Sequence, residues 1–321
     1  MALADFPLCV KLPASVGLPD DPAGLRFVGS NGNALAFEIE TWDAAGESVV
    51  WVRVPSLAQG TTLRALWSAT TAAHGAAHAD TVWNSEYKAV YHLASGNDSS
   101  PNARHFETDT LSVDAAGAVG RGRSFAGTAS KHMTRHAPWL ADLSGAFTIS
   151  GWIRPAADAT GQAYMMQMYN DYAQFAILYN WDGGRVLQFF HGYEMNAYGS
   201  GAQGEDMRYT ASPMTIPDDG DWHHFAYSYD QEAFSVYLDG ELLRCLPREY
   251  GLGSGQPGLQ NVNFELGQTR GSGNRFKGDL DEIRFESARR SDAWLRACYL
   301  SQKGALVSVR PESAGFKIIF R

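Results

Sequence analysis

The chain has few cysteines and little charge for its 321 residues. Cys9, Cys245 and Cys298 are widely spaced and follow no metal-ligand or redox pattern, so we expect free, mostly buried thiols. Charged residues make up 19% of the chain and the net charge is −9, which leaves no basic excess for nucleic acid or an anionic membrane surface. We therefore predict no nucleic-acid partner, while a neutral polysaccharide or a cation stays compatible with the composition.

Long apolar runs and catalytic signatures are missing as well. No stretch reaches the roughly 18 apolar residues that a membrane-spanning helix needs, so we expect no membrane insertion in this segment. The first residues, MALADFP, lack the basic and apolar regions of a signal peptide. G-x-S-x-G, H-E-x-x-H, Walker and Rossmann patterns do not occur, so no short motif indicates an enzyme.

What the chain does contain is typical of an all-β protein with many turns. It has 33 glycines and 12% aromatic residues. Its clearest pattern is a predicted hairpin in which Phe234, Val236 and Leu238 alternate with polar residues, before a two-residue turn at Asp239-Gly240. The adjacent residues His223 and His224 precede this strand, and alternation should place their side chains on opposite faces of the sheet.

Strand and turn signals divide the chain into three parts. Residues 1–78 predict a small β-sandwich of short strands, including one in which Phe37 and Ile39 share a face. Residues 79–303 predict a larger β-sandwich that ends in a helix from Ser291 to Leu300, with Ser291 as its N-cap. Residues 304–321 predict a C-terminal strand segment, and the stretch 68–85 is typical of a linker.

The first part resembles a known bacterial domain. Its stretch LRFVGSNGNALAFEIETWDAAGESVVWVRVP lies within a similarity that covers nearly all of residues 5–67. The resemblance is to the domain of unknown function DUF2341. That family typically precedes a laminin-G-like domain in secreted or surface proteins, and it also occurs in MotA/TolQ/ExbB-type transport proteins. The resemblance implies an extracytoplasmic location (secreted, periplasmic or cell surface), with the leader absent from this chain.

The second part resembles the laminin-G-like, concanavalin A-like jelly-roll family. The matching stretches are VYHL, SGAFTISGWIRP, DWHHFAYSYD and FKGDLDEIRFESARRS, in the order in which the family has them. We therefore predict an all-β fold, with a small N-terminal β-sandwich followed by a concanavalin A-like jelly roll.

Acidic residues suggest a calcium site. Calcium prefers carboxylate, amide and carbonyl oxygens. Asp98 and Asn102 in a turn, together with Asp281 from a late strand, could supply these oxygens at one edge of the sandwich; alternatively, Asp98 and Asn102 simply shape the turn. Strand alternation places Asp279 and Asp281 on one face and Glu282 on the other, so a pair of catalytic carboxylates is a further, less favoured interpretation.

Aromatic residues between positions 164 and 209 suggest a sugar site. Flat apolar rings stack on pyranose rings, and nearby polar groups bind hydroxyls. The candidates that we place on loops are Tyr172, Trp181, Tyr193 and Tyr198.

Three functions follow from these features. We favour a non-catalytic, extracytoplasmic carbohydrate-binding or adhesion module pair that binds polysaccharide or glycan, with a possible calcium cofactor. The alternative is a structural or assembly subunit, either of a surface fibre or of a MotA/TolQ/ExbB-type protein; the third is a glycoside hydrolase or lyase. For assembly, the stretch from Phe316 to Phe320 could complete the first domain's sheet within the same chain or in a neighbour, and the second case would allow self-association through the chain termini.

Overall fold

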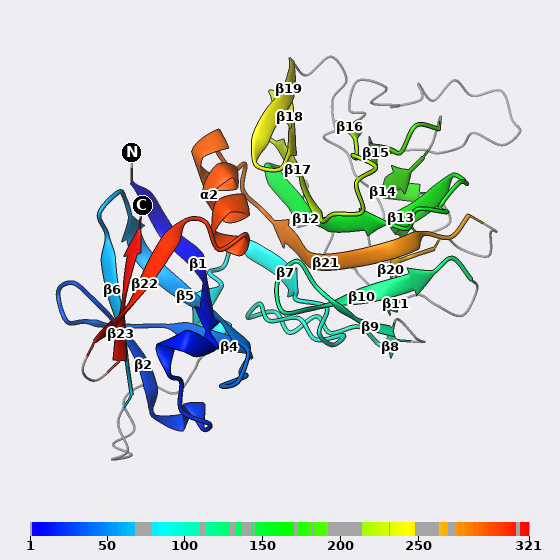
Figure 1. Cartoon of the computed structure of the whole chain (residues 1–321). Coiled ribbons are helices and arrows are strands. Elements are labelled where there is room, and N and C mark those ends of the chain that lie inside the picture. The colour runs from blue at the N-terminus through cyan, green and yellow to red at the C-terminus, as the bar shows by residue number, and fades with distance from the viewer. Residues whose placement is uncertain are drawn as a thin grey trace, which may run out of the picture.

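The structure, a computed structural model, describes residues 2–67, 79–109, 113–128, 133–136, 143, 145–169, 173–180, 183–191, 214–230, 232–247, 263–268, 274–312 and 315–320. Strands dominate, and the helix α2 (Asp292–Gln302) lies between a smaller and a larger β-sandwich (Figure 1). The predicted all-β fold is therefore confirmed. The described helices include none that is long and apolar enough to cross a membrane.

The smaller sandwich has two sheets, ordered β1-β5-β4 and β22-β23-β6-β2-β3. Its apolar core lies between them, and the long pair β1·β5 forms the side that faces the larger sandwich (Figure 1). Two short 3-10 helices, Ala14–Val16 and Pro22–Gly24, follow β1. The strands are β1 (Leu3–Pro13), β2 (Leu25–Gly29), β3 (Ala34–Leu35), β4 (Phe37–Thr41), β5 (Glu47–Leu57), β6 (Thr62–Trp67), β22 (Val307–Glu312) and β23 (Gly315–Phe320).

The C-terminal strand completes the smaller sandwich within the same chain. β23 pairs antiparallel with β6, so that Phe316 faces Ala65 and Ile318 faces Leu63. Phe316 and Ile318 are both fully buried, and the ring of Phe316 lies 5.2 Å from that of Trp67. Of the two arrangements that the sequence left open, the structure has the intramolecular one.

The larger sandwich packs two antiparallel sheets on an aromatic-rich core. One has the order β19-β18-β17-β12-β21-β10-β9, with β7 paired to β21, and the other has the order β16-β15-β14-β13-β20-β11-β8. The first sheet contains β7 (Tyr87–Tyr91), β9 (Val113–Ala116), β10 (Arg121–Ala126), β12 (Phe147–Pro155), β17 (His223–Tyr229), β18 (Ala233–Leu238), β19 (Glu241–Pro247) and β21 (Lys277–Glu286). The second contains β8 (Thr108–Asp109), β11 (Met133–His136), β13 (Ala163–Tyr169), β14 (Ala173–Tyr179), β15 (Val186–His191), β16 (Met214–Thr215) and β20 (Asn263–Leu266).

Local sequence explains the β18–β19 hairpin and the helix beside it. Asp239 and Gly240 have φ values of 51° and 75°, as the predicted two-residue turn requires. A Cβ on Gly240 would lie 2.9 Å from Cβ of Tyr299 in α2, so glycine also allows the helix to pack closely here. Ser291 caps α2 by accepting a hydrogen bond from the backbone N–H of Trp294 at 3.3 Å, which confirms the predicted N-cap.

A β-bulge in β21 overturns one expectation. Leu280 and Ile283 both face the core of the larger sandwich, although they are three residues apart. Glu282 has a φ of 52°, and the pairing with β12 shifts register at this point. The expectation that Asp281 and Glu282 lie on opposite faces is therefore wrong, because the extra residue leaves both between two core positions.

The predicted linker is partly wrong too. Residues 68–78 lie outside the described part of the chain, but α1 (Ala79–Val82) and the residues after it are folded. Val82 and Trp83 are 1% exposed and belong to an apolar cluster that joins the two sandwiches. The indole rings of Trp83 and Trp51 lie 5.4 Å apart in this cluster, so the chain enters the larger sandwich through a packed interface.

The C-terminal strand generates the first prediction. Phe316→Ala should lower the free energy of unfolding by about 3–5 kcal/mol, because it removes a fully buried ring from the core. Urea denaturation followed by tryptophan fluorescence measures this change. Leu243→Ala is the control, since Leu243 is 45% exposed and its loss should cost less than about 0.5 kcal/mol. Equal effects of the two changes would contradict the role of β23.

Candidate functional site

The predicted sugar-stacking residues cannot be placed. Tyr172, Trp181, Tyr193 and Tyr198 all lie outside the described residues. They stay predictions.

The predicted calcium ligands all have other partners. Asp98 accepts four hydrogen bonds, from the backbone N–H groups of Val90, Ser100 and Arg104 and from the Ser100 hydroxyl, at 2.7–2.9 Å. Asn102 donates to the backbone carbonyls of residues 87 and 88. Asp281 accepts from the backbone N–H groups of residues 119 and 282. Asp98 and Asn102 thus shape one turn, Asp281 holds the turn between β9 and β10, and calcium binding by the three stays a prediction.

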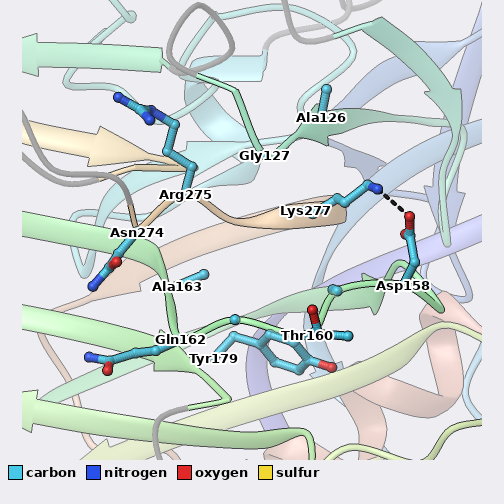
Figure 2. Close-up of a pocket in the computed structure, with 12 residues that line it drawn as sticks. Ala126, Gly127, Asp158, Thr160, Gln162, Ala163, Tyr179, Asn274, Arg275 and Lys277 are labelled. Carbon is cyan, nitrogen blue, oxygen red and sulfur yellow. Dashed lines mark hydrogen bonds and ion pairs between the residues drawn. The ribbon is translucent and has the colours of Figure 1, made fainter.

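A polar hollow of about 420 Å³ opens at one end of the larger sandwich (Figure 2). It lies where β21 begins, and β21 runs from there toward α2 and the smaller sandwich (Figure 1). The end of β10, the loop between β12 and β13, the end of β14 and the segment before β21 form its walls. Its lining residues are Ala126, Gly127, Asp158, Ala159, Thr160, Gly161, Gln162, Ala163, Tyr179, Asn274, Arg275 and Lys277.

Hydrogen-bonding groups surround this hollow. Figure 2 shows Gln162 and Asn274 extending on one side of it, and Lys277 paired with Asp158 on the other. Tyr179 lies beside Thr160, and its hydroxyl is buried with no hydrogen-bond partner among the described residues. The hollow therefore offers amide, hydroxyl and charged groups to a small polar ligand, and one of its hydroxyls is unsatisfied.

A second polar cluster lies between the two sandwiches, and strand alternation creates its first half. In β4, Phe37 and Ile39 pack against the smaller core, as predicted, so the intervening Glu38 and the next residue Glu40 point to the larger sandwich. Trp51 in β5 lies on the same side and donates its indole N–H to Glu40 Oε2 at 2.7 Å. Glu38 accepts from the indole of Trp83 at 2.7 Å.

The larger sandwich supplies the other half. His92, directly after β7, places Nδ1 2.6 Å from Glu282 Oε1 and 3.5 Å from Glu40 Oε2. Its Nε2 lies 3.4 Å from Glu38 Oε2. Arg284 donates to Glu282 Oε2 at 2.5 Å, and its guanidinium lies over the Trp51 ring at 4.4 Å. We call Glu38, Glu40, His92, Asp281, Glu282 and Arg284 the interdomain cluster.

Burial and charge determine which members of the interdomain cluster ionise. Burial, followed by the Glu282 carboxylate, raises the pKa of Glu40 to about 8 and also raises the pKa of Asp281. For Glu282, burial works in the same direction, but the charges of His92 and Arg284 outweigh it and lower its pKa. The three glutamates likewise overcome the burial of His92 and raise its pKa well above 6.5.

The cluster is thus close to charge balance at pH 7. The pKa of Glu38 is lowered as well, because the His92 charge and three hydrogen bonds outweigh the effect of burial. Ionised Glu38 and Glu282 then face charged His92 and Arg284, whereas Glu40 and Asp281 hold protons. Such a cluster can fix two domains against each other, and its histidine and carboxylates can also exchange protons for a cation.

Sequence reasoning missed this cluster, although its members belong to the stretches that carry the two resemblances. Glu38 and Glu40 come from FEIE, His92 from VYHL, and Glu282 from LDEIRF. Each polar residue repeats within a motif of otherwise apolar strand residues, and that was the available signal.

Comparison with known families matches both parts of the chain. A family model described as the concanavalin A-like lectin/glucanases superfamily matches residues 127–296, and the model of the domain of unknown function DUF2341 matches residues 21–93. The second match includes β7 and His92, so it extends across the interface between the sandwiches. No curated protein matches the chain.

Solved structures share the fold at low identity. Domain 4 of AbnA, an extracellular arabinanase from Geobacillus stearothermophilus, in complex with arabinotriose, is 18% identical with a TM-score of 0.46, over 66% of this chain and 97% of that domain. The binding domain of botulinum neurotoxin DC, in complex with rat synaptotagmin II, is 8% identical with a TM-score of 0.49, and the match covers 68% of this chain and 52% of that one. These similarities are too distant to indicate a function.

The ion pairs of Glu282 generate the second prediction. Glu282→Gln should lower the free energy of unfolding by about 3–5 kcal/mol at pH 7, because it leaves His92 and Arg284 buried without their counterion. Chemical denaturation measures the loss. In the control, Glu241→Gln breaks a surface pair with Arg296, where Glu241 is 67% exposed, and should cost less than about 1 kcal/mol. A loss no larger than that of the control would count against the cluster as a link between the domains.

The raised pKa of Glu40 generates the third prediction. An acid whose folded pKa lies above its ordinary value of 4.5 favours folding at low pH, and this contribution is lost as the pH rises through about 8. Glu40→Gln imitates the protonated acid and cannot ionise. The variant should match the wild type near pH 5 and exceed its free energy of unfolding at pH 9 by more than about 1.4 kcal/mol, the equivalent of one pKa unit.

Denaturation curves in EDTA, which keeps divalent cations from competing with protons, measure this difference. Glu47→Gln is the matched control, because the Glu47 side chain is 53% exposed. Wild-type and Glu40→Gln stabilities that run parallel from pH 5 to pH 9 would show that Glu40 ionises normally.

Proposed function

The chain belongs to the concanavalin A-like lectin/glucanases superfamily, and from this premise we propose that it is a non-catalytic, extracytoplasmic carbohydrate-binding module whose larger sandwich binds glycan in the polar hollow. The observation that carries the proposal is the hollow itself, which gathers polar side chains from four segments at one end of the sandwich. Its volume of about 420 Å³ lies at the lower end of the range of small-ligand sites. One or two sugar units fit that size.

The chemistry of the hollow suits sugar hydroxyls, which both donate and accept hydrogen bonds. Gln162 and Asn274 offer amides, and the pair of Lys277 and Asp158 offers a donor and an acceptor side by side. The buried hydroxyl of Tyr179 has no partner among the described residues, so a ligand hydroxyl would satisfy it. Trp181 follows Tyr179 by two residues in the sequence, and we assign it the role of stacking platform.

The carboxylates considered for catalysis support a binding role rather than hydrolysis. Asp279 is paired with Arg154 at 2.7 Å, and Asp281 is fully buried between backbone N–H groups. A glycosidase needs two carboxyl groups that face the scissile bond across an open site. Within the described residues, this pair does not meet that requirement.

The fourth prediction tests the hollow. Tyr179→Phe should weaken glycan binding about tenfold, since it deletes one hydrogen-bonding hydroxyl worth about 1 kcal/mol, and Trp181→Ala should weaken it at least as much through lost stacking. A glycan array identifies the ligand, and calorimetry measures its affinity. Tyr237→Phe is the matched control, because its hydroxyl donates to Asp292 beside α2 and lies outside the hollow's lining.

Two results would reject parts of this proposal. Absence of binding to any glycan would reject the function, and full binding by both Tyr179→Phe and Trp181→Ala would reject the site. Binding in EGTA tests the separate hypothesis that calcium, held by Asp98, Asn102 and Asp281, is a cofactor.

A further inference from the structure

The interdomain cluster brings three ligand-type side chains together from three segments. Glu40 comes from the smaller sandwich, His92 from the start of the larger one and Glu282 from the bulge of β21. One ligand atom from each lies within 4.8 Å of the other two. All three side chains are at most 8% exposed, so these are not surface charges that happen to be close.

His92 is oriented as a metal-binding imidazole is. Its Nδ1 faces the carboxylates of Glu40 and Glu282, and its Nε2 faces Glu38 Oε2 at 3.4 Å. Glu38 is itself fixed, because it accepts hydrogen bonds from Trp83 and from the Ser99 hydroxyl at 2.6 Å. A carboxylate on the far nitrogen of a histidine is the usual support of a metal ligand, since it sets the ring orientation and makes the near nitrogen more basic.

The two carboxylates are also held, and one is incompletely satisfied. Trp51 fixes Glu40 through Oε2, and Arg284 fixes Glu282 through Oε2. Glu40 Oε1 is buried and has no hydrogen-bond partner among the described residues, although its side chain is only 2% exposed. A buried carboxylate oxygen without a partner is unfavourable, and a cation is one way to satisfy it.

We propose that Glu40, His92 and Glu282 form a binding site for a divalent transition-metal ion, with zinc as the best fit. One imidazole nitrogen with two carboxylates is a mixed ligand set that suits zinc, whereas calcium prefers oxygen alone. Ligand atoms about 2.0–2.1 Å from a tetrahedral zinc lie roughly 3.4 Å apart. His92 Nδ1 and Glu40 Oε2 are already 3.5 Å apart, and Glu282 Oε1, at 2.6 Å, has to move back by less than about 1 Å.

The exchange balances charge and protons. The zinc ion replaces one proton on His92 Nδ1 and one on Glu40, so two protons leave as two positive charges enter. Glu282 and Glu38 stay ionised and Arg284 stays charged, so the buried cluster keeps its net charge. Because the ligands come from both sandwiches, the ion would join them directly.

Refolding tests the site, because its burial hinders exchange in the folded protein. The full chain is denatured in EDTA and refolded at pH 8 in zinc, manganese or calcium ions or in EDTA, and unbound metal is removed. We expect one equivalent of zinc per chain by elemental analysis, weaker retention of calcium, and a melting temperature several degrees above that in EDTA. Wild-type protein that retains no zinc and melts identically in zinc and in EDTA would overturn the proposal.

Glu40→Gln is the decisive variant. Glutamine keeps the acceptor for Trp51 and imitates the protonated acid, so the variant should fold in EDTA, but it should bind zinc at least 100-fold more weakly and show no zinc-dependent rise in melting temperature. Glu47→Gln makes the same change on the surface and should bind zinc as the wild type does. Equal zinc binding by Glu40→Gln would overturn the assignment.

A second measurement applies should Glu40→Gln fail to fold. X-ray absorption of the zinc-refolded wild type should show one imidazole nitrogen with oxygen ligands. A shell that contains sulfur, or oxygen alone, would overturn the assignment.

Discussion

The ion pair between His92 and Glu282 is the interaction on which the arrangement of the two sandwiches depends. Isolated ions are costly to bury, by several kcal/mol each, so neither side chain could occupy this interface without the other. Arg284 and Glu38 extend the pair to a nearly neutral group of four charges. The stacked indoles of Trp51 and Trp83 then close the cluster against water.

The bulge in β21 makes this interaction possible. A regular strand would direct either Asp281 or Glu282 into the apolar core of the larger sandwich, where an acid would find no partner. The extra residue at Glu282 directs both acids away from the core while Leu280 and Ile283 stay inside. One acid then holds the turn between β9 and β10, and the other binds His92.

Much of the fold could be predicted because it rests on local patterns. Alternation in β4 and β18, the Asp239-Gly240 turn and the Ser291 cap are properties of short segments, and the structure confirms them. The bulge was missed because strict alternation was assumed through LDEIRF. The packed residues around Trp83 were missed because a stretch rich in alanine, threonine and histidine is typical of a linker.

The interdomain cluster could not be found from spacing, since residues 38, 92 and 282 are far apart in the chain and only tertiary packing brings them together. The hollow has the same character, because its walls come from four separate segments. The family matches divide the chain near residue 93, but the structure does not divide it there: β7 and His92 belong to the larger sandwich. The smaller sandwich likewise includes the C-terminal hairpin.

The pairing of β23 with β6 has a mechanical consequence. The first and last described strands both belong to the smaller sandwich, and the larger sandwich is inserted between β6 and β22 (Figure 1). Tension applied at residues 2 and 320 therefore passes through the smaller sandwich and bypasses the larger one. The inserted sandwich, with its hollow at the far end, hangs beside the line of force and keeps its shape while the smaller sandwich carries the load.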